Sequence, residues 1–147
     1  MMTDQRFQEL KCAATGALSY EVTISESAER TIVVTRRVLP TDGLPDFARV
    51  LTRAGLTLTE TLDWSSPTAD GHRIADVALA FTGQPLKMTG QLTMAAVGCD
   101  TTCTLRAELK AGVPLFGARI EQATAPVIER ALDTEQGLGQ KWLTEHP

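Results

Sequence analysis

Glu60 is a carboxylate placed among apolar side chains, which makes it the strongest candidate for a chemical role in this sequence. Alternation along residues 56–64 puts Glu60 on the leucine-bearing face of a strand. A carboxylate on such a face is costly unless it is paired or hydrated. One interpretation is an ion pair with Arg36, Arg73 or a helix residue, or a bulge that breaks the alternation. The other is a polar anchor inside an apolar cavity.

Two other groups could act as an acid or a base. Asp76 shares a strand face with the apolar Ile74, and His72 follows Gly71 at the start of a strand. Neither is accompanied by a local serine or cysteine nucleophile motif. The sequence also has no glycine-rich phosphate loop, so it predicts no catalytic residue and no cofactor.

The three cysteines, Cys12, Cys99 and Cys103, do not form a metal-binding pattern. Cys99 and Cys103 are close in sequence, but no histidine or third cysteine lies near them. Cys103 falls on an apolar strand face, which predicts a buried structural thiol rather than a zinc ligand. An odd and scattered set of cysteines favours free thiols in a reduced compartment.

Composition excludes several classes of protein. The chain has 147 residues, 43% of them hydrophobic and 22% charged, which suits one domain with a buried core. Its formal net charge of -4 and lack of clustered lysines and arginines argue against nucleic-acid binding. The start of the chain has no secretory signal, and no apolar run is long enough to cross a membrane. We therefore expect a cytoplasmic protein with no integral membrane contact.

Periodicity predicts an α+β fold. Six segments alternate like strands or are rich in β-branched residues, and short turns favour antiparallel pairing. Helical patterns flank and interrupt them, and the longest lies at the C-terminal end. The expected strands are 18–25, 31–39, 56–64, 73–82, 86–94 and 101–113, and the expected helices are 3–11, 46–54 and 117–143. The sequence thus predicts an antiparallel sheet of about six strands with a long helix across one face.

Finer features of these elements are also predicted. In the first helix, Thr3 is the expected cap, and Phe7 and Leu10 are expected on the packed face. Pro126 should bend or restart the last helix. Gly90, between Met88 and Met94, leaves room on the inner face of its strand. Small residues of the expected helix 117–143 leave room opposite it. Such residues either allow close packing or leave a void.

Several segments resemble the START-like superfamily, also called the SRPBCC or polyketide cyclase and lipid-transfer superfamily, and within it the bacterial domain of unknown function 2505. The resembling segments are LPTDGLPDFARVL (Leu39–Leu51), ETLDW (Glu60–Trp64), the turn Gly83–Pro85, VPLFGARIE (Val113–Glu121) and EQGLGQKWL (Glu135–Leu143). The resemblance implies a helix-grip fold that forms a cavity, and it supplies no catalytic motif. The family pattern also has a strand and the start of a helix before the segment that matches residue 3 onward. This chain is therefore expected to begin inside that helix, which leaves an open sheet edge and room for a homodimer.

The sequence and the resemblance together predict a binding module for an apolar or amphipathic small molecule or lipid. The ligand is expected between the sheet and the last helix. The expected ligand-binding residues are Leu58, Glu60, Val77, Leu79, Met88, Leu92, Leu105, Leu109, Val127 and Ala131. Two alternatives remain: a small cyclase- or hydrolase-like enzyme that uses Glu60, Asp76 or His72, and a structural or interaction domain with a filled core.

Overall fold

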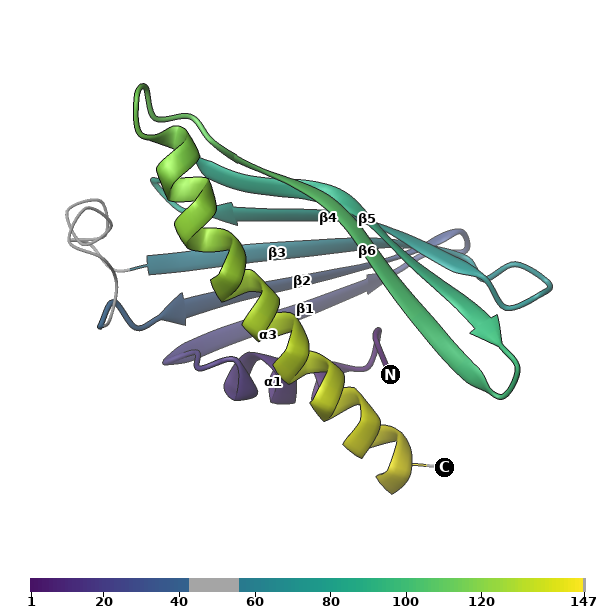
Figure 1. The fold of residues 1–147 in the computed structure, drawn as a ribbon. Coiled ribbons are helices and arrows are strands. Elements are labelled where there is room, and N and C mark those ends of the chain that lie inside the picture. Colours follow the sequence, from purple (N-terminus) through teal and green to yellow (C-terminus); the bar gives the residue numbers. More distant parts are fainter. Residues whose placement is uncertain (43–55, 147) are drawn as a thin grey trace.

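The computed structural model describes residues 1–42 and 56–146, so the helix expected at 46–54 lies outside the described residues. The predicted fold class is confirmed: six strands form one antiparallel sheet in the order β1-β2-β3-β4-β5-β6, and a long C-terminal helix lies on one side of it (Figure 1). The elements are α1 (Gln5–Ala14), β1 (Ser19–Glu26), β2 (Arg30–Leu39), β3 (Leu56–Ser65), β4 (Arg73–Phe81), β5 (Leu86–Val97), β6 (Asp100–Ala111) and α3 (Gly117–Glu145).

The sheet is a meander in which each strand pairs with the next one in the chain. Tight turns close the last two hairpins, where Gly83 and Gly98 adopt positive φ angles of 72° and 63°. Strands β5 and β6 are the longest, and they twist and curl over the rest of the sheet (Figure 1). This curl makes one face of the sheet concave.

Gly90 allows the close approach of β5 and β6. A Cβ atom built at Gly90 would collide with the carbonyl oxygen of Arg106 and with the backbone of Ala107. The expectation that Gly90 leaves room in the interior is therefore wrong. The backbone of the neighbouring strand fills that space, and glycine is the residue that fits beside it.

The packed core lies on the concave face of the central strands. Trp64 and Ala75 are fully buried, and Arg73 lies over the Trp64 ring at 5.3 Å. The buried cluster consists of Val33, Leu58, Leu62, Trp64, Ala75, Val77, Leu79 and Met88. The alternation of β3 and β4 predicted this face, since side chains two residues apart point to the same side of a strand.

Helix α1 begins and ends later than its pattern suggests. Asp4, not Thr3, caps it: the Asp4 carboxylate accepts a hydrogen bond from the Phe7 N–H at 2.9 Å. The buried face carries Phe7, Gln8, Lys11 and Cys12, whereas Leu10 is 40% exposed. The helix therefore packs a more polar face than expected.

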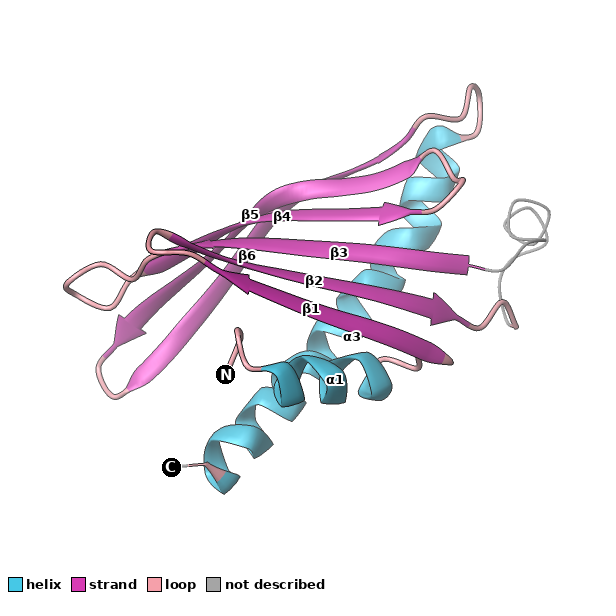
Figure 2. Ribbon diagram, turned by 180° about the vertical axis from the view of Figure 1, so that it is seen from behind, coloured by secondary structure: helices cyan, strands magenta, loops and turns pink. Residues whose placement is uncertain are grey.

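Helix α3 crosses the concave side of the sheet diagonally, as both ribbon views show (Figures 1 and 2). It contacts β6 and α1. Pro126 lies inside the helix, which continues through it without a restart, so of the two predicted effects only a bend stays a prediction. Only Ile120, Gly139 and Trp142 of this helix are buried. The helix face that carries Val127 and Ala131 forms an apolar stripe, and Val127 is 51% exposed. The stripe faces the sheet without packing tightly against it.

Two strand faces are more open than predicted. Leu18, just before the edge strand β1, and Tyr20 within it are both exposed, although alternation in the expected strand 18–25 places them on its apolar face. Cys103 was expected to be buried, and it is exposed on the other edge strand, β6. No helix among the described residues is long and apolar enough to cross a membrane.

Candidate functional site

A cavity of about 890 Å³ lies between the concave face of the sheet and helix α3. Side chains from β2 to β6 form its floor, and the stripe of α3 forms its roof. Most of the lining is apolar. Such a volume falls within the usual range of small-molecule sites, about 300–1,000 Å³.

All of the residues predicted to bind a ligand, except Leu109, lie in this lining. They are Leu58, Glu60, Val77, Leu79, Met88, Leu92, Leu105, Val127 and Ala131. Leu109 is partly buried and packs against the core cluster instead. Strand alternation and helical spacing brought these positions together on facing surfaces, and whether they contact a ligand stays a prediction.

The lining also includes residues that were not predicted to bind a ligand. On α3 these follow the same helical spacing as Val127 and Ala131, so periodicity could have found them. They include Ile128, Leu132, Gln136, Gly139 and Leu143. Met1, Met2 and Phe7 come from the N-terminal segment and α1, and no pattern in the sequence places those elements beside the sheet.

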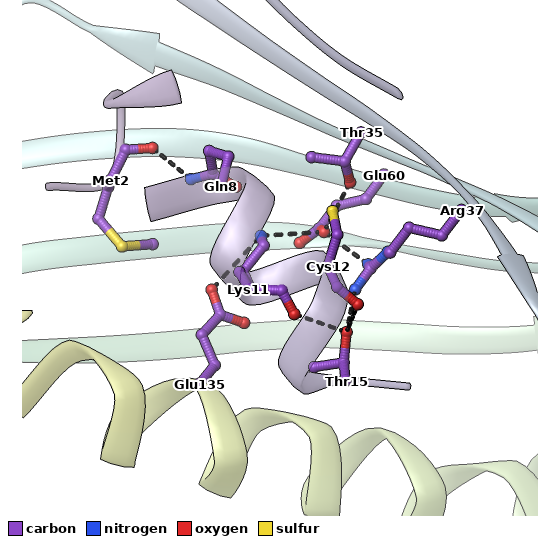
Figure 3. Close-up of polar contacts among 9 residues, drawn as sticks. All are labelled: Met2, Gln8, Lys11, Cys12, Thr15, Thr35, Arg37, Glu60 and Glu135. Carbon is purple, nitrogen blue, oxygen red and sulfur yellow. Dashed lines mark hydrogen bonds and ion pairs between the residues drawn. The ribbon is translucent and has the colours of Figure 1, made fainter. Parts of the chain in front are cut away.

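Glu60 lies in the cavity lining at the centre of a polar cluster (Figure 3). Thr35 is directly opposite it on β2 and donates a hydrogen bond to Glu60 Oε2 at 3.3 Å. Arg37, two residues further along the same face of β2, donates from Nη2 to this oxygen at 2.7 Å. Arg36 and Arg73 were the strand residues predicted to pair with Glu60. Arg36 points to the opposite, exposed face, and Arg73 bonds to Ser65 and Thr31 instead.

Lys11 links this strand cluster to both helices. Its side chain is fully buried, and its Nζ lies 3.1 Å from Glu60 Oε2 and 3.4 Å from Glu135 Oε1 on α3. The prediction that a helix residue pairs with Glu60 thus agrees with the structure. The ion-pair interpretation of Glu60 is confirmed, and Glu60 also lines the cavity; its role as a polar anchor there stays a prediction.

Burial and neighbouring charges act differently on the two glutamates. Burial opposes ionisation of Glu60, but the adjacent Lys11 and Arg37 outweigh it and hold the Glu60 pKa below its ordinary value. For Glu135, burial is the stronger influence and raises the pKa. Lys11 has a raised pKa because both carboxylates together outweigh its burial. Glu135 is therefore the member of the cluster that is most easily neutralised.

The sequence carried a weak signal for this cluster. Thr35 and Arg37 alternate with the buried Val33, which places all three on the inner face of β2. Lys11 is four residues after Phe7 and shares its helix face. Their convergence on Glu60 depends on how α1 and α3 sit against the sheet, which periodicity does not predict.

The other candidate acid and base lie away from the cavity. Asp76 is on the outer face of β4, where it accepts a hydrogen bond from Gln91 at 3.1 Å and lies 3.6 Å from Arg30. His72 is half exposed in a turn, with its ring nitrogen 3.8 Å from Asp70. Neither residue belongs to the lining.

No metal site is formed by the described part of the chain, where no group of three histidine, cysteine, aspartate or glutamate side chains converges. The three cysteines are free; Cys12 is buried, and burial raises its pKa. Cys103 lies in the cavity lining.

Comparison with known proteins places the chain in a family without supplying an activity. No curated protein and no solved structure matches the sequence. A family model described as "Protein of unknown function (DUF2505)" matches residues 1–143, which is nearly the whole chain. The chain therefore belongs to the DUF2505 family.

Proposed function

We propose that this protein binds an apolar or amphipathic small molecule in the cavity between the sheet and α3. The observation that carries the proposal is the apolar stripe of α3, which is turned toward the concave sheet yet is not packed against it. Val127 is 51% exposed and Leu132 is 40% exposed, although both line the cavity. Burying such side chains against a ligand gains about 25 cal/mol per Å² of apolar surface.

The layout of the sheet and the helix also supports kinship with the START-like superfamily. A curved antiparallel meander with a long C-terminal helix across its concave side is the helix-grip arrangement that the sequence segments resemble. Kinship of fold does not identify a ligand or an activity. The proposed contact residues are those predicted from the sequence that lie in the lining, with Glu60 as the polar one.

An enzyme of the same fold is the second candidate, and the geometry of Glu60 favours it less. A general acid or base needs a proton that it can exchange near neutral pH. Lys11 and Arg37 hold the Glu60 pKa low, so this carboxylate stays ionised and engaged in its ion pairs. A purely structural domain with a filled core is disfavoured by the size of the cavity.

Blocking the cavity from the roof tests the proposal. Ala131 lies on α3 in the lining, and Ala131→Trp should abolish saturable uptake of the neutral fluorescent probe N-phenylnaphthylamine while the protein remains folded. Ala118→Trp is the matched control, because Ala118 is on the same helix, exposed and outside the lining. Probe binding and thermal melting are measured on all three proteins.

The outcomes separate the candidates. The binding function is supported if the wild type and Ala118→Trp bind the probe with a defined stoichiometry and Ala131→Trp does not bind it. A wild type that takes up no probe, together with a large melting loss in Ala131→Trp, indicates a packed core, in which overfilling costs about 1–3 kcal/mol. If the binding function is supported, native mass spectrometry of protein purified from its own host would identify the molecule that occupies the cavity.

A further inference from the structure

The groups of the Glu60 cluster that a ligand in the cavity could reach are mainly carboxylates. The side chains of Glu60 and Glu135 are 14% and 19% exposed, whereas Lys11 is fully buried and does not belong to the lining formed by the described residues. Arg37 is only 8% exposed, and its two terminal nitrogens already donate to Thr15 and Glu60. The polar end of a ligand would therefore meet oxygen atoms that accept hydrogen bonds.

Both carboxylates have room for a further donor. Lys11, Thr35 and Arg37 all donate to Oε2 of Glu60, so within the described part of the chain its other oxygen accepts no hydrogen bond. Glu135 is engaged more weakly. Its Oε1 lies 3.4 Å from Lys11 Nζ, and among the described residues it has no other ion-pair partner (Figure 3). A group that donates to these carboxylates from the cavity side would complete their hydrogen bonding.

Charge favours a cation as that donor. Of the described residues in the lining, Arg37 has the one basic side chain, whereas Glu60, Asp133 and Glu135 are three carboxylates. With the buried Lys11 included, three negative side chains face two positive ones. Burial raises the Glu135 pKa, which means that the fold compensates this charge less well than water does. The formal net charge of the whole chain, -4, also attracts cations and repels a ligand carboxylate.

We propose that the ligand is an apolar amine, whose protonated nitrogen donates hydrogen bonds to Glu60 and Glu135 and whose apolar part lies between the sheet and α3. This inference rests on the proposed binding function and specifies its ligand. An ammonium group has several N–H donors on one atom. Lys11 Nζ lies 3.1 Å and 3.4 Å from the two carboxylates, so a single ammonium can reach both. The ligand would do from the cavity side what Lys11 does from the side of α1.

Ligands with the same chain and different head groups test this inference. Decylamine, decanol and decanoic acid, each below its micelle-forming concentration, are used to displace N-phenylnaphthylamine from the wild-type protein at neutral pH. The amine should bind at least about tenfold more tightly than the alcohol, as expected for one charge-assisted hydrogen bond. The acid should bind most weakly of the three, because it brings a negative charge to a carboxylate-rich site.

Two variants on α3 provide the matched comparison. Glu135→Gln should lower the affinity for decylamine by about tenfold and leave decanol binding nearly unchanged. Glu129→Gln removes the same charge from the same helix, but Glu129 is exposed and outside the lining, so this variant should keep the preference for the amine. Thermal melting of both variants checks that each remains folded. The comparison distinguishes a contact in the cavity from a general attraction between the amine and an acidic protein.

Failure of the inference differs from failure of the binding function. Equal binding of amine and alcohol by the wild type, tighter binding of the acid, or equal effects of Glu135→Gln and Glu129→Gln on amine binding would each overturn the amine assignment. The binding function would survive any of these results. No saturable displacement by any of the three compounds, with no uptake of the probe, would overturn both.

Discussion

Removing Glu60 and removing Glu135 should affect stability very differently, although both carboxylates contact Lys11. Glu60 Oε2 lies 3.1 Å from Lys11 Nζ and 2.7 Å from Arg37 Nη2. At an effective dielectric constant near 20, these contacts correspond to Coulomb attractions of about 5 and about 6 kcal/mol. Desolvation, of several kcal/mol per ion, offsets most of this. Glu60→Gln abolishes both attractions and leaves Lys11 and Arg37 buried with only Glu135 as an anion.

We expect Glu60→Gln to lower the free energy of unfolding by about 3–5 kcal/mol, the usual cost of removing one partner from a buried ion pair. Glu135→Gln should cost less than about 1 kcal/mol, because burial raises the Glu135 pKa, which means that the folded protein stabilises the charged carboxylate less well than water does. Each glutamine has nearly the shape of the glutamate that it replaces. The comparison therefore isolates charge.

Urea unfolding followed by circular dichroism at neutral pH measures both values. The pH dependence supplies a second readout. The lowered pKa of Glu60 gives stability that is present above the ordinary glutamate pKa of about 4.3 and is lost as the pH falls through the folded-state value. Glu135 has the opposite sign, since its ionisation above that pH opposes folding. In a plot of the free energy of unfolding against pH, Glu60→Gln should reduce the loss of stability at acid pH. Glu135→Gln should leave that loss in place.

Two results would contradict this prediction: an equal decrease in the free energy of unfolding in both variants, or a larger decrease in Glu135→Gln. Either result would mean that the charge of Lys11 is compensated mainly by Glu135 on α3 and not by Glu60 on β3. An unchanged loss of stability at acid pH in Glu60→Gln would show that Glu60 does not titrate below its ordinary range.

Two further results are expected. Gly90→Ala should lower stability by about 1–3 kcal/mol in the same unfolding assay, because its Cβ would collide with the β6 backbone. Gly137→Ala, where a Cβ meets nothing, should be neutral or stabilising by up to about 1 kcal/mol, and a similar loss in both would contradict the close-approach argument. In timed alkylation read by peptide mass spectrometry, exposed Cys99 should react well before Cys12, which is buried and has a raised pKa. Equal rates for the two thiols would show that the α1 face opens readily.

The sheet could be predicted from the sequence because it depends on local signals. Alternation in β3 and β4 identifies the buried face, and glycines mark the turns between the later strands. The first helix was predicted less well, since Leu10 seemed the natural partner of Phe7. Its packed face instead carries Lys11, whose burial makes sense only when Glu60 and Glu135 are already in place.

The void itself could not be predicted. An apolar stripe such as that containing Val127 and Ala131 has the same pattern whether it packs on a sheet or roofs a cavity. Small residues do not distinguish the two cases either: Gly90 is filled by a neighbouring backbone, whereas Ala131 lies in an open lining. The difference is the distance between helix and sheet, which is set by contacts between distant parts of the chain.

Helix α1 supplies the contacts that hold α3 away from the sheet. It packs against β1 and also contacts α3 (Figure 2). The Phe7 ring meets Trp142 of α3 edge-on, with 5.5 Å between ring centroids, and the Met1 side chain packs beside Gly139, 3.4 Å from where a Cβ on that residue would be. Lys11 bridges Glu60 on β3 and Glu135 on α3, so a buried side chain joins the sheet and the helix here, in addition to the direct contact of α3 with β6. The same polar cluster thus separates the two layers and presents Glu60 and Glu135 to the space that this separation creates.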